Sequence, residues 1–224
     1  MTAALLFDLD GTLVDSDAAH LRAFQRVFAA HGVALDKQTY DRLILGSDNA
    51  AIGRAFLPHL SAAEQASTLA AKEERYREDL GAVEPIAGVD ALLEFAAARG
   101  LRCAVVTNAP RANVEAVLGA LGLAARLPTR VLGPELARAK PDPLPYQTAL
   151  KRLGAEAGRS LAFEDSLSGL RAAKGAGLAV VGLTTTLAAD KLLAAGAEIA
   201  VADFADPRIL PLIEARTAAP GKKA

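Results

Sequence analysis

Short apolar runs alternate with longer amphipathic stretches along the chain after Pro85. Apolar runs of this kind, bounded by glycine and polar residues, predict buried strands, and the stretches between them have the apolar spacing of helices. Such alternation is typical of a parallel sheet with helices on both faces. We predict strands at residues 101–106, 130–132, 160–163, 178–181 and near Ile199, and helices at 87–98, 111–121, 143–153, 170–175, 187–195 and 207–216.

Between Asp17 and Leu80 the alternation disappears and only helical spacing remains. Helices are predicted at residues 18–30, 37–45, 49–57 and 62–80, separated by glycine, serine and proline. The sequence therefore predicts an α/β protein with a Rossmann-like parallel-sheet core and an inserted α-helical cap domain. We assign residues 1–15 and 86–217 to the core and 16–85 to the cap, with hinges at 13–16 and 81–85 and a disordered tail at 218–224.

The first apolar run, at residues 4–7, ends abruptly in Asp8 and Asp10. In a strand of period two these carboxylates point to the same side, and burying one without a partner costs several kcal/mol. A hard cation, Mg2+ or Ca2+ in preference to zinc, would resolve this conflict. A calcium-binding EF-hand loop is excluded, because Leu13 and Ala19 stand where that loop needs glycine and glutamate. The carboxylates should lie at a strand's carboxyl end, where open α/β sheets place their sites.

Composition narrows the class of protein. The chain has 224 residues, 52% of them hydrophobic, and a formal net charge of −1, which offers no electrostatic footprint for nucleic acid or an anionic membrane. The one cysteine, Cys103, stands inside an apolar run and is interpreted as a packed thiol. The start of the chain lacks a basic region followed by an apolar one. We expect a cytoplasmic protein, a monomer or weak dimer, whose partner is a small molecule.

Polar residues follow three further predicted strands or turns. Thr107 and Asn108 end one strand just before a helix and could bind an anion, although an ordinary turn would look the same. Lys140 precedes the stiff segment Pro141-Asp142-Pro143, and alone it would be interpreted as a surface charge. Glu164 and Asp165 repeat the pattern of an apolar run followed by two carboxylates, which favours metal ligation over surface charge.

Taken together, these residues resemble in order and spacing the motifs of the haloacid dehalogenase superfamily of phosphotransferases, over essentially the whole chain. The inserted cap resembles the subgroup of phosphoglycolate phosphatases, hexose phosphatases and β-phosphoglucomutase. The resemblance implies that Asp8 is the nucleophile and that Asp10 protonates the leaving alcohol and then activates water. It implies that Mg2+ is held by Asp8, the Asp10 backbone carbonyl, Asp165 and Glu164, the last directly or through water, and that Thr107, the Asn108 amide and Lys140 hold the phosphoryl oxygens.

Two cap residues are candidates for substrate contact. His20 resembles a gate or substrate residue of the mutase-like subgroup, and a surface or packed histidine is the alternative. Lys72, followed one turn later by Tyr76, matches a substrate-facing lysine, but it also begins the charged run 72–75, which a solvated helix face would explain equally well.

The function that follows from the resemblance is Mg2+-dependent hydrolysis of a small phosphate monoester, such as phosphoglycolate or a sugar phosphate, through an aspartyl-phosphate. A β-phosphoglucomutase-like mutase is the alternative. It is disfavoured because the run Gly46-Ser47-Asp48-Asn49 has no arginine to grip a second phosphate before Arg54. A non-catalytic phosphate-binding protein is a hypothesis of another class, and it would be expected to lose the nucleophile or the metal carboxylates, which are all present here.

Overall fold

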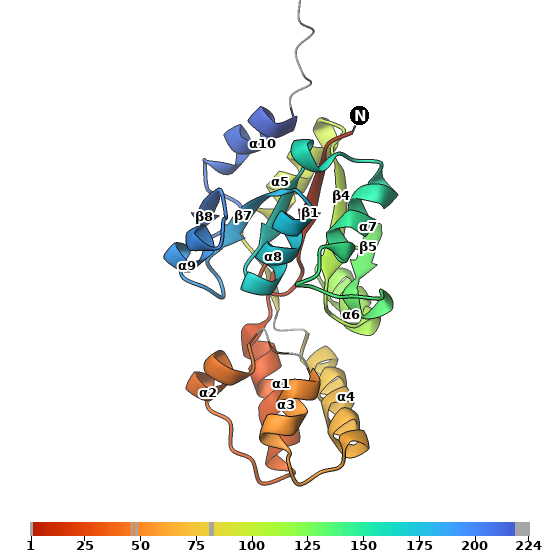
Figure 1. The fold of residues 1–224 in the computed structure, drawn as a ribbon, viewed down its shortest axis with the longest axis vertical. Helices are drawn as coiled ribbons and strands as arrows, with labels where there is room; N and C mark the ends of the chain where they lie inside the picture. Colours follow the sequence, from red (N-terminus) through yellow and green to blue (C-terminus); the bar gives the residue numbers. More distant parts are fainter. Residues whose placement is uncertain (1, 46, 48, 81–82, 218–224) are drawn as a thin grey trace, which may run out of the picture. The chain divides into compact units, whose positions relative to one another are not determined.

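The computed structural model describes residues 2–45, 47, 49–80 and 83–217. The tail predicted at 218–224, and Gly46 and Asp48 of the predicted mutase-discriminating run, lie outside the described residues. Two compact units make up the chain, Met1–Asp15 with Glu84–Ala224 and Ser16–Val83, which we call the core unit and the helical unit. The elements keep the labels of Figure 1.

The core unit is built on a six-stranded sheet in the order β5-β4-β1-β6-β7-β8. Adjacent strands pair in parallel throughout, and β1 lies between β4 and β6. The chain therefore runs outward from β1 in one direction and then in the other, which makes β1 the switch point where such sheets place ligands. The strands are β1 (Ala4–Phe7), β4 (Arg102–Thr107), β5 (Thr129–Leu132), β6 (Leu161–Glu164), β7 (Ala179–Leu183) and β8 (Ile199–Val201).

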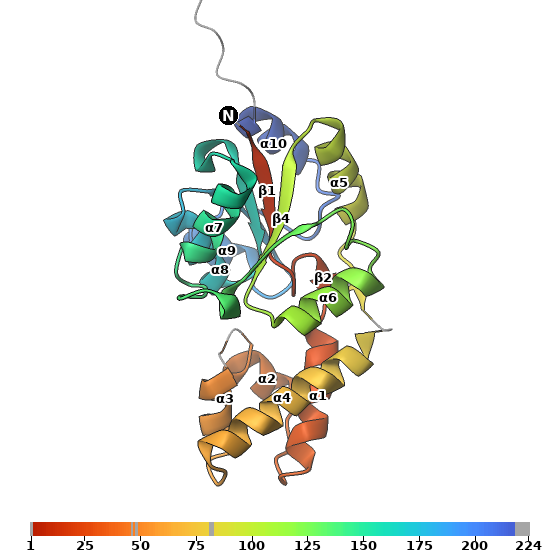
Figure 2. The same ribbon diagram turned by 90° about the vertical axis from the view of Figure 1, so that its right-hand side faces the viewer.

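Helices cover both faces of this sheet, as its fully buried central strands require. Figure 2 shows α7 (Leu144–Leu153), α8 (Leu167–Gly175) and α9 (Ala189–Ala194) on one side, and α5 (Val89–Ala98) and α6 (Arg111–Ala120) on the other. The strands pack on α7, α8 and α9 through small and branched apolar side chains. This cluster includes Leu6, Val106, Tyr146, Ala162, Leu170, Val180 and Leu192. The last helix, α10, spans Ile209–Thr217. The predicted α/β class is confirmed.

The helical unit contains α1 (Asp17–Ala29), α2 (Lys37–Leu43), α3 (Asn49–Phe56) and α4 (Ala62–Glu78). It has an apolar core of its own, which includes Phe24, Phe28, Tyr40, Ile52, Leu57 and Leu69. The longest helix, α4, begins with a complete capping box, because the Ser61 side chain accepts from the Glu64 backbone while Glu64 reaches back to Ser61. Ser61 and Glu64, the capping-box residues in the sequence, therefore begin this helix in the structure.

Two of the differences from the sequence prediction bear on the boundary between the units and on the candidate site. First, Val14–Asp15 (β2) and Glu84–Pro85 (β3) form a short antiparallel pair, so Glu84 and Pro85 belong with the core unit and not with residues 16–83. Second, α8 begins at Leu167 instead of residue 170, because the Ser166 side chain accepts a hydrogen bond from Gly169 and caps the helix earlier. Among the described residues, no helix has the length and apolar character to cross a membrane.

Candidate active site

The carboxylates meet because of the strand register. Phe7 pairs with Val105 of β4 on one side and with Phe163 of β6 on the other. The next residues, Asp8 and Glu164, are therefore neighbours on adjacent strands, and the Asp8 backbone donates to the Phe163 carbonyl at 3.0 Å. Because side chains alternate along a strand, both carboxylates project on the face that carries α7 and α8.

Lys140 joins these two carboxylates. Its Nζ lies 2.6 Å from Asp8 Oδ1 and 2.6 Å from Glu164 Oε1, and its side chain is 4% exposed. The lysine comes from the loop between β5 and α7, and the alternative interpretation as a solvated surface charge is wrong. A buried lysine between two carboxylates is a fixed positive charge at the end of β1.

Asn108 holds the backbone of Lys140 in place. Its side-chain Nδ2 donates to the Lys140 carbonyl at 3.0 Å, and its Oδ1 accepts from the Lys140 backbone N–H at 3.1 Å. Gly133 makes room for this contact, because a Cβ there would lie 2.3 Å from Asn108 Oδ1. Thr107, the preceding residue, is buried, and its Oγ1 accepts from the Ala109 backbone at 3.1 Å. The Asn108 side chain is thus committed to the Lys140 backbone.

Glu164 is the most buried of the acidic groups, with no exposed surface. Its Oε1 accepts from Lys140 and also from the Tyr146 hydroxyl, at 2.5 Å, while Ser166 Oγ lies 3.4 Å from Oε2. Helix α8 packs directly on this carboxylate, since a Cβ at Gly169 would lie 1.9 Å from Oε2. Glu164 is therefore held on several sides and fixes the position of Lys140.

Asp165 faces the turn that follows β1. Thr186 Oγ1 donates to its Oδ2, and Thr12 Oγ1 lies 3.4 Å from its Oδ1. Gly11 has a φ of +71°, and a Cβ at this position would lie 2.2 Å from Asp165 Oδ2. Glycine is thus required twice at this turn, for its backbone conformation and for the space that Asp165 occupies.

Burial and mutual repulsion shift the pKa values of these groups. Desolvation, with help from Glu164 and against the attraction of Lys140, raises the pKa of Asp8 from 3.8 to about 7. Desolvation and the carboxylates of Asp8 and Glu164 likewise raise the pKa of Asp165 well above its usual value. Burial alone would lower the pKa of Lys140, but its two carboxylate partners outweigh that effect and raise it. The site holds more negative charge than one lysine neutralises.

A divalent cation fits this excess. Ligand atoms of Asp8, Glu164 and Asp165 all lie within 4.8 Å of one another, and all three residues are buried. Carboxylate oxygens are the ligands that Mg2+ prefers. The side chain of Asp10 does not belong to this group. Asp10 is partly buried in the turn, where the Gly11 N–H donates to the Val14 carbonyl at 2.8 Å.

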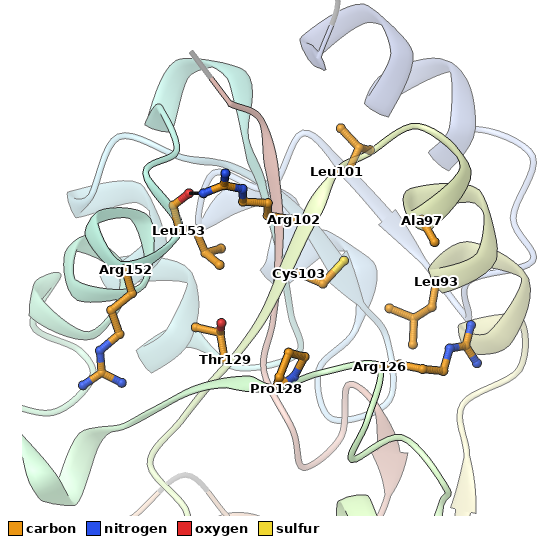
Figure 3. Close-up of a pocket in the computed structure, with 10 residues that line it drawn as sticks. All are labelled: Leu93, Ala97, Leu101, Arg102, Cys103, Arg126, Pro128, Thr129, Arg152 and Leu153. Carbon is orange, nitrogen blue, oxygen red and sulfur yellow. Dashed lines mark hydrogen bonds between the residues drawn. The ribbon is translucent and has the colours of Figure 1, made fainter.

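The cavity in Figure 3 lies elsewhere, at the amino end of β4. It has a volume of about 450 Å³ and is lined by residues that include Arg102, Arg126, Arg152 and Cys103. The guanidinium groups of these arginines do not converge on it. They donate to the Leu153 carbonyl, to Asp90 and to the Arg130 carbonyl respectively. This cavity is therefore a weaker candidate for a substrate site than the carboxylate cluster.

The helical unit contains the two candidate substrate residues, and they contact each other. Lys72 Nζ lies 2.9 Å from His20 Nδ1 and 3.2 Å from the Glu73 carboxylate. The His20 ring stacks on Tyr76 with centroids 3.9 Å apart, and Lys72 Nζ lies 4.5 Å from the Phe24 ring centroid. Lys72 is only 4% exposed, so its interpretation as part of a solvated helix face is wrong.

Sequence reasoning missed four contributors to the core site. Tyr146 was assigned only to a helix, and Thr185 and Thr186 only to a loop before one. Gly169 was not singled out. For Tyr146 a signal was available, because it follows Lys140 by six residues and so falls in the first turns of the helix that the lysine precedes. The threonines carry no comparable signal, since their contacts depend on how β7 packs beside β6.

Comparisons with known proteins agree with this geometry. A family model described as haloacid dehalogenase-like hydrolase matches residues 5–183. The validoxylamine A 7'-phosphate phosphatase of Streptomyces hygroscopicus subsp. limoneus is 33% identical over 212 residues, covering 93% of this chain and 97% of the relative. The phosphoglycolate phosphatase of Rhodospirillum rubrum is 35% identical over 215 residues, covering 92% and 89%. A crystal structure of a CbbY mutant from Rhodobacter sphaeroides in complex with xylulose-(1,5)-bisphosphate has a TM-score of 0.81 at 32% identity, covering 92% and 96%.

Proposed function

The chain belongs to the haloacid dehalogenase-like hydrolases, and from that membership we propose that it is a Mg2+-dependent phosphatase. It hydrolyses a small phosphate monoester, phosphoglycolate or a sugar phosphate, through an aspartyl-phosphate on Asp8. The observation that carries the proposal is the placement of Lys140 Nζ, 2.6 Å from both Asp8 and Glu164, beside a third buried carboxylate.

Asp8 is the nucleophile in this proposal. One of its oxygens attacks the phosphorus of the bound ester, the ester P–O bond breaks, and the alcohol leaves with a proton from Asp10. Asp10 then takes a proton from a water molecule, which attacks the phosphorus and releases inorganic phosphate and the Asp8 carboxylate. An aspartate nucleophile thus divides one difficult displacement into two easier ones.

Repulsion between anions is the main obstacle to the first step. A carboxylate approaching a phosphate oxygen at 4 Å meets about 4 kcal/mol of repulsion per pair of unit charges at an effective dielectric of about 20. Lys140 offsets this penalty at one side of the site. Thr107 and the Asn108 backbone N–H orient the phosphoryl oxygens and stabilise the charge that develops on them.

Mg2+ would be held by Asp8, Asp165 and the Asp10 backbone carbonyl, with Glu164 contributing directly or through water. When bound, the ion supplies positive charge that stabilises the equatorial phosphoryl oxygens in the transition state. The raised pKa values of Asp8 and Asp165 support this assignment, because burial and the neighbouring carboxylates disfavour their ionised forms and a bound cation would offset this.

Substrate choice is assigned to the helical unit. We propose that Lys72 recognises an anionic group of the substrate and that His20 orients Lys72 through their contact at 2.9 Å. The similarity to phosphatases of phosphoglycolate and of validoxylamine A 7'-phosphate, and to a complex with xylulose-(1,5)-bisphosphate, supports a small phosphorylated metabolite. We propose a cytoplasmic location for such an enzyme and a monomer or weak dimer as its state.

The test is a screen of phosphorylated metabolites that measures inorganic phosphate with Mg2+ and with EDTA. We expect release that requires Mg2+ and a preference of at least tenfold in kcat/KM for one compound class. Failure of every monoester, p-nitrophenyl phosphate included, would favour a non-catalytic phosphate-binding protein.

A mutase is the competing activity. Incubation with β-glucose 1-phosphate, Mg2+ and a priming bisphosphate separates the two, because glucose 6-phosphate and free phosphate can be followed independently. We expect free phosphate to dominate. Fast formation of glucose 6-phosphate with little phosphate release would replace the phosphatase assignment with a mutase.

A further inference from the structure

The loop between β7 and α9 contacts two separate parts of the proposed metal site. It carries three consecutive threonines, Thr184, Thr185 and Thr186. Thr186 Oγ1 donates to Asp165 Oδ2 at the end of β6. Thr185 Oγ1 donates to the Gly11 carbonyl at 2.5 Å, in the turn that follows β1. None of the motif residues that identify the family lies in this loop, yet it touches both segments that would hold Mg2+.

Asp165 needs such a restraint because of its surroundings. It is 5% exposed, and ligand atoms of Asp8 and Glu164 lie within 4.8 Å of its own. These like charges push its carboxylate away from the geometry in which all three groups share one cation. The hydroxyl of Thr12 is distant, at 3.4 Å, so the bond from Thr186 is the closer of the two restraints.

Thr185 acts on the other segment. The Gly11 backbone has a φ of +71°, and its carbonyl lies one peptide after the Asp10 carbonyl that is proposed as a metal ligand. A hydrogen bond to the Gly11 carbonyl fixes the orientation of the turn and so limits the rotation of the neighbouring peptide. The β7–α9 loop therefore ties the turn after β1 to the end of β6.

We infer that Thr186 is a positioning residue that orients the Asp165 carboxylate for a divalent cation, and that Thr185 supports it by fixing the Asp10-Gly11 turn. The inference rests on the proposed metal site. Hydrogen-bond partners of metal ligands typically change metal affinity by 10- to 100-fold when removed. The loop thus sets how tightly the enzyme holds its metal, without contacting the metal itself.

The experiment measures Mn2+ binding to the purified full chain in the absence of substrate. Free hexaaqua Mn2+ is quantified by electron paramagnetic resonance, so the readout does not depend on turnover. Thr186→Val removes the hydroxyl at constant shape, and Thr186→Ser keeps it. Thr184→Val is the matched control, because within the described part of the chain the Thr184 side chain makes no hydrogen bond. Asp165→Asn shows which part of the signal comes from this site.

We expect Thr186→Val to weaken Mn2+ binding by roughly tenfold or more, and Thr185→Val by less. Thr186→Ser should restore affinity to within about threefold, and Thr184→Val should bind as the wild type does. The Mg2+ concentration that half-saturates phosphate release should rise in the same order. If Thr186→Val does not fold, as judged by circular dichroism, Thr186→Ala removes the same hydroxyl and takes its place.

Equal Mn2+ affinity in the wild type and in Thr186→Val would overturn the inference while leaving the proposed function intact. So would a Thr186→Ser variant as weak as Thr186→Val, because the hydroxyl would then not be the cause. Wild-type protein that binds no Mn2+ would be a different failure, since it removes the metal from the proposed function and the inference with it.

Discussion

Lys140 and Lys72 are both buried, with side chains 4% and 5% exposed, but their surroundings differ. Lys140 lies in the core unit between two carboxylates, each 2.6 Å away. Lys72 lies in the helical unit, 2.9 Å from an imidazole nitrogen and 3.2 Å from a neighbouring carboxylate, over an aromatic ring. Desolvating an ammonium costs several kcal/mol in both places.

The difference shows what each lysine is suited to do. Short contacts to two carboxylates, with Asn108 holding the backbone, make Lys140 a fixed charge at the proposed reaction centre. Lys72 contacts His20, the Glu73 carboxylate and an aromatic ring, and its 3.2 Å contact with Glu73 is longer than the two 2.6 Å contacts that Lys140 makes. We therefore assign chemistry to Lys140 and recognition to Lys72, and the predictions below test that division.

The largest effect is expected for Lys140→Met. Removing one partner of a buried ionic group leaves Asp8 and Glu164 uncompensated, which should lower the free energy of unfolding of the metal-free protein by about 3 to 5 kcal/mol. Loss of the charge facing the phosphoryl group should lower kcat by roughly 10²- to 10³-fold. Urea unfolding and phosphate-release assays measure the two effects. Lys151→Met, on the exposed side of α7, is the control and should change neither.

Gly11→Ala tests whether the candidate site in the core unit needs the space that Gly11 leaves for Asp165. The new Cβ would meet Asp165 Oδ2 at 2.2 Å and would also strain the backbone at a φ of +71°. Gly122→Ala is the matched control, because its φ is +68° and no atom lies within 4 Å of the new Cβ. We expect about 1 kcal/mol of destabilisation from the strained backbone in both variants. Only Gly11→Ala should also lose Mg2+-dependent activity, and equal losses in the two would show that Asp165 does not need this space.

Lys72→Met should have a smaller and different effect. If Lys72 recognises the anionic group of the substrate, its removal should raise KM for the preferred metabolite by about tenfold, the loss of one charge-assisted contact. The fall in kcat should be smaller than the rise in KM. Steady-state kinetics on the preferred metabolite separates the two terms. Lys37→Met, an exposed lysine of the same unit that pairs with Asp41, should leave both unchanged. A fall in kcat as large as that of Lys140→Met would contradict the assignment of chemistry to Lys140 and recognition to Lys72.

The last prediction concerns Cys103, a partly buried thiol that belongs to neither lysine site and should not affect activity. Desolvation raises the pKa of its thiol from 9.0 to about 12, despite the weak opposing charge of Arg126. At pH 8 the thiolate fraction should therefore be about a thousandfold below that of an unperturbed thiol, and labelling by a thiol reagent should be correspondingly slow. Burial disfavours the thiolate only in the folded protein. The contribution of Cys103 to the free energy of unfolding is therefore fully present below the pKa of the thiol in the unfolded chain, and it is lost as the pH rises towards about 12. Labelling as fast as in urea would contradict this.

The sequence pointed to the residues of the candidate site because of one geometric fact. Parallel strands end at the same edge of a sheet, so polar residues after separate strands meet there even when their order in the chain is distant. Asp8, Thr107, Glu164 and Asp165 were found in this way. Lys140 follows a strand less directly, and only its stiff flanking prolines and its place in the motif order marked it.

The missed contacts depend on how elements that are distant in the chain pack together. Tyr146 reaches Glu164 only because α7 lies against β1, β4 and β5, and Lys72 is buried only because of how α1 packs on α4. Glycine is required at position 169 because the Glu164 carboxylate leaves no space for a Cβ, and not because of the backbone conformation. In the sequence, Gly169 therefore looks like any other small helical residue. Contacts between elements far apart in the chain therefore need the structure, whereas residues at strand ends do not.

Trapping the covalent intermediate tests the central assignment, that Asp8 is the nucleophile. Enzyme is mixed with substrate and Mg2+, quenched in acid and treated with borohydride, which reduces an acyl phosphate to an alcohol. Peptide mass spectrometry then locates the product. We predict homoserine at position 8, present only when substrate and Mg2+ are both supplied and absent in an inactive Asp8→Asn variant. Turnover with an unmodified Asp8, or reduction at another carboxylate, would contradict the account.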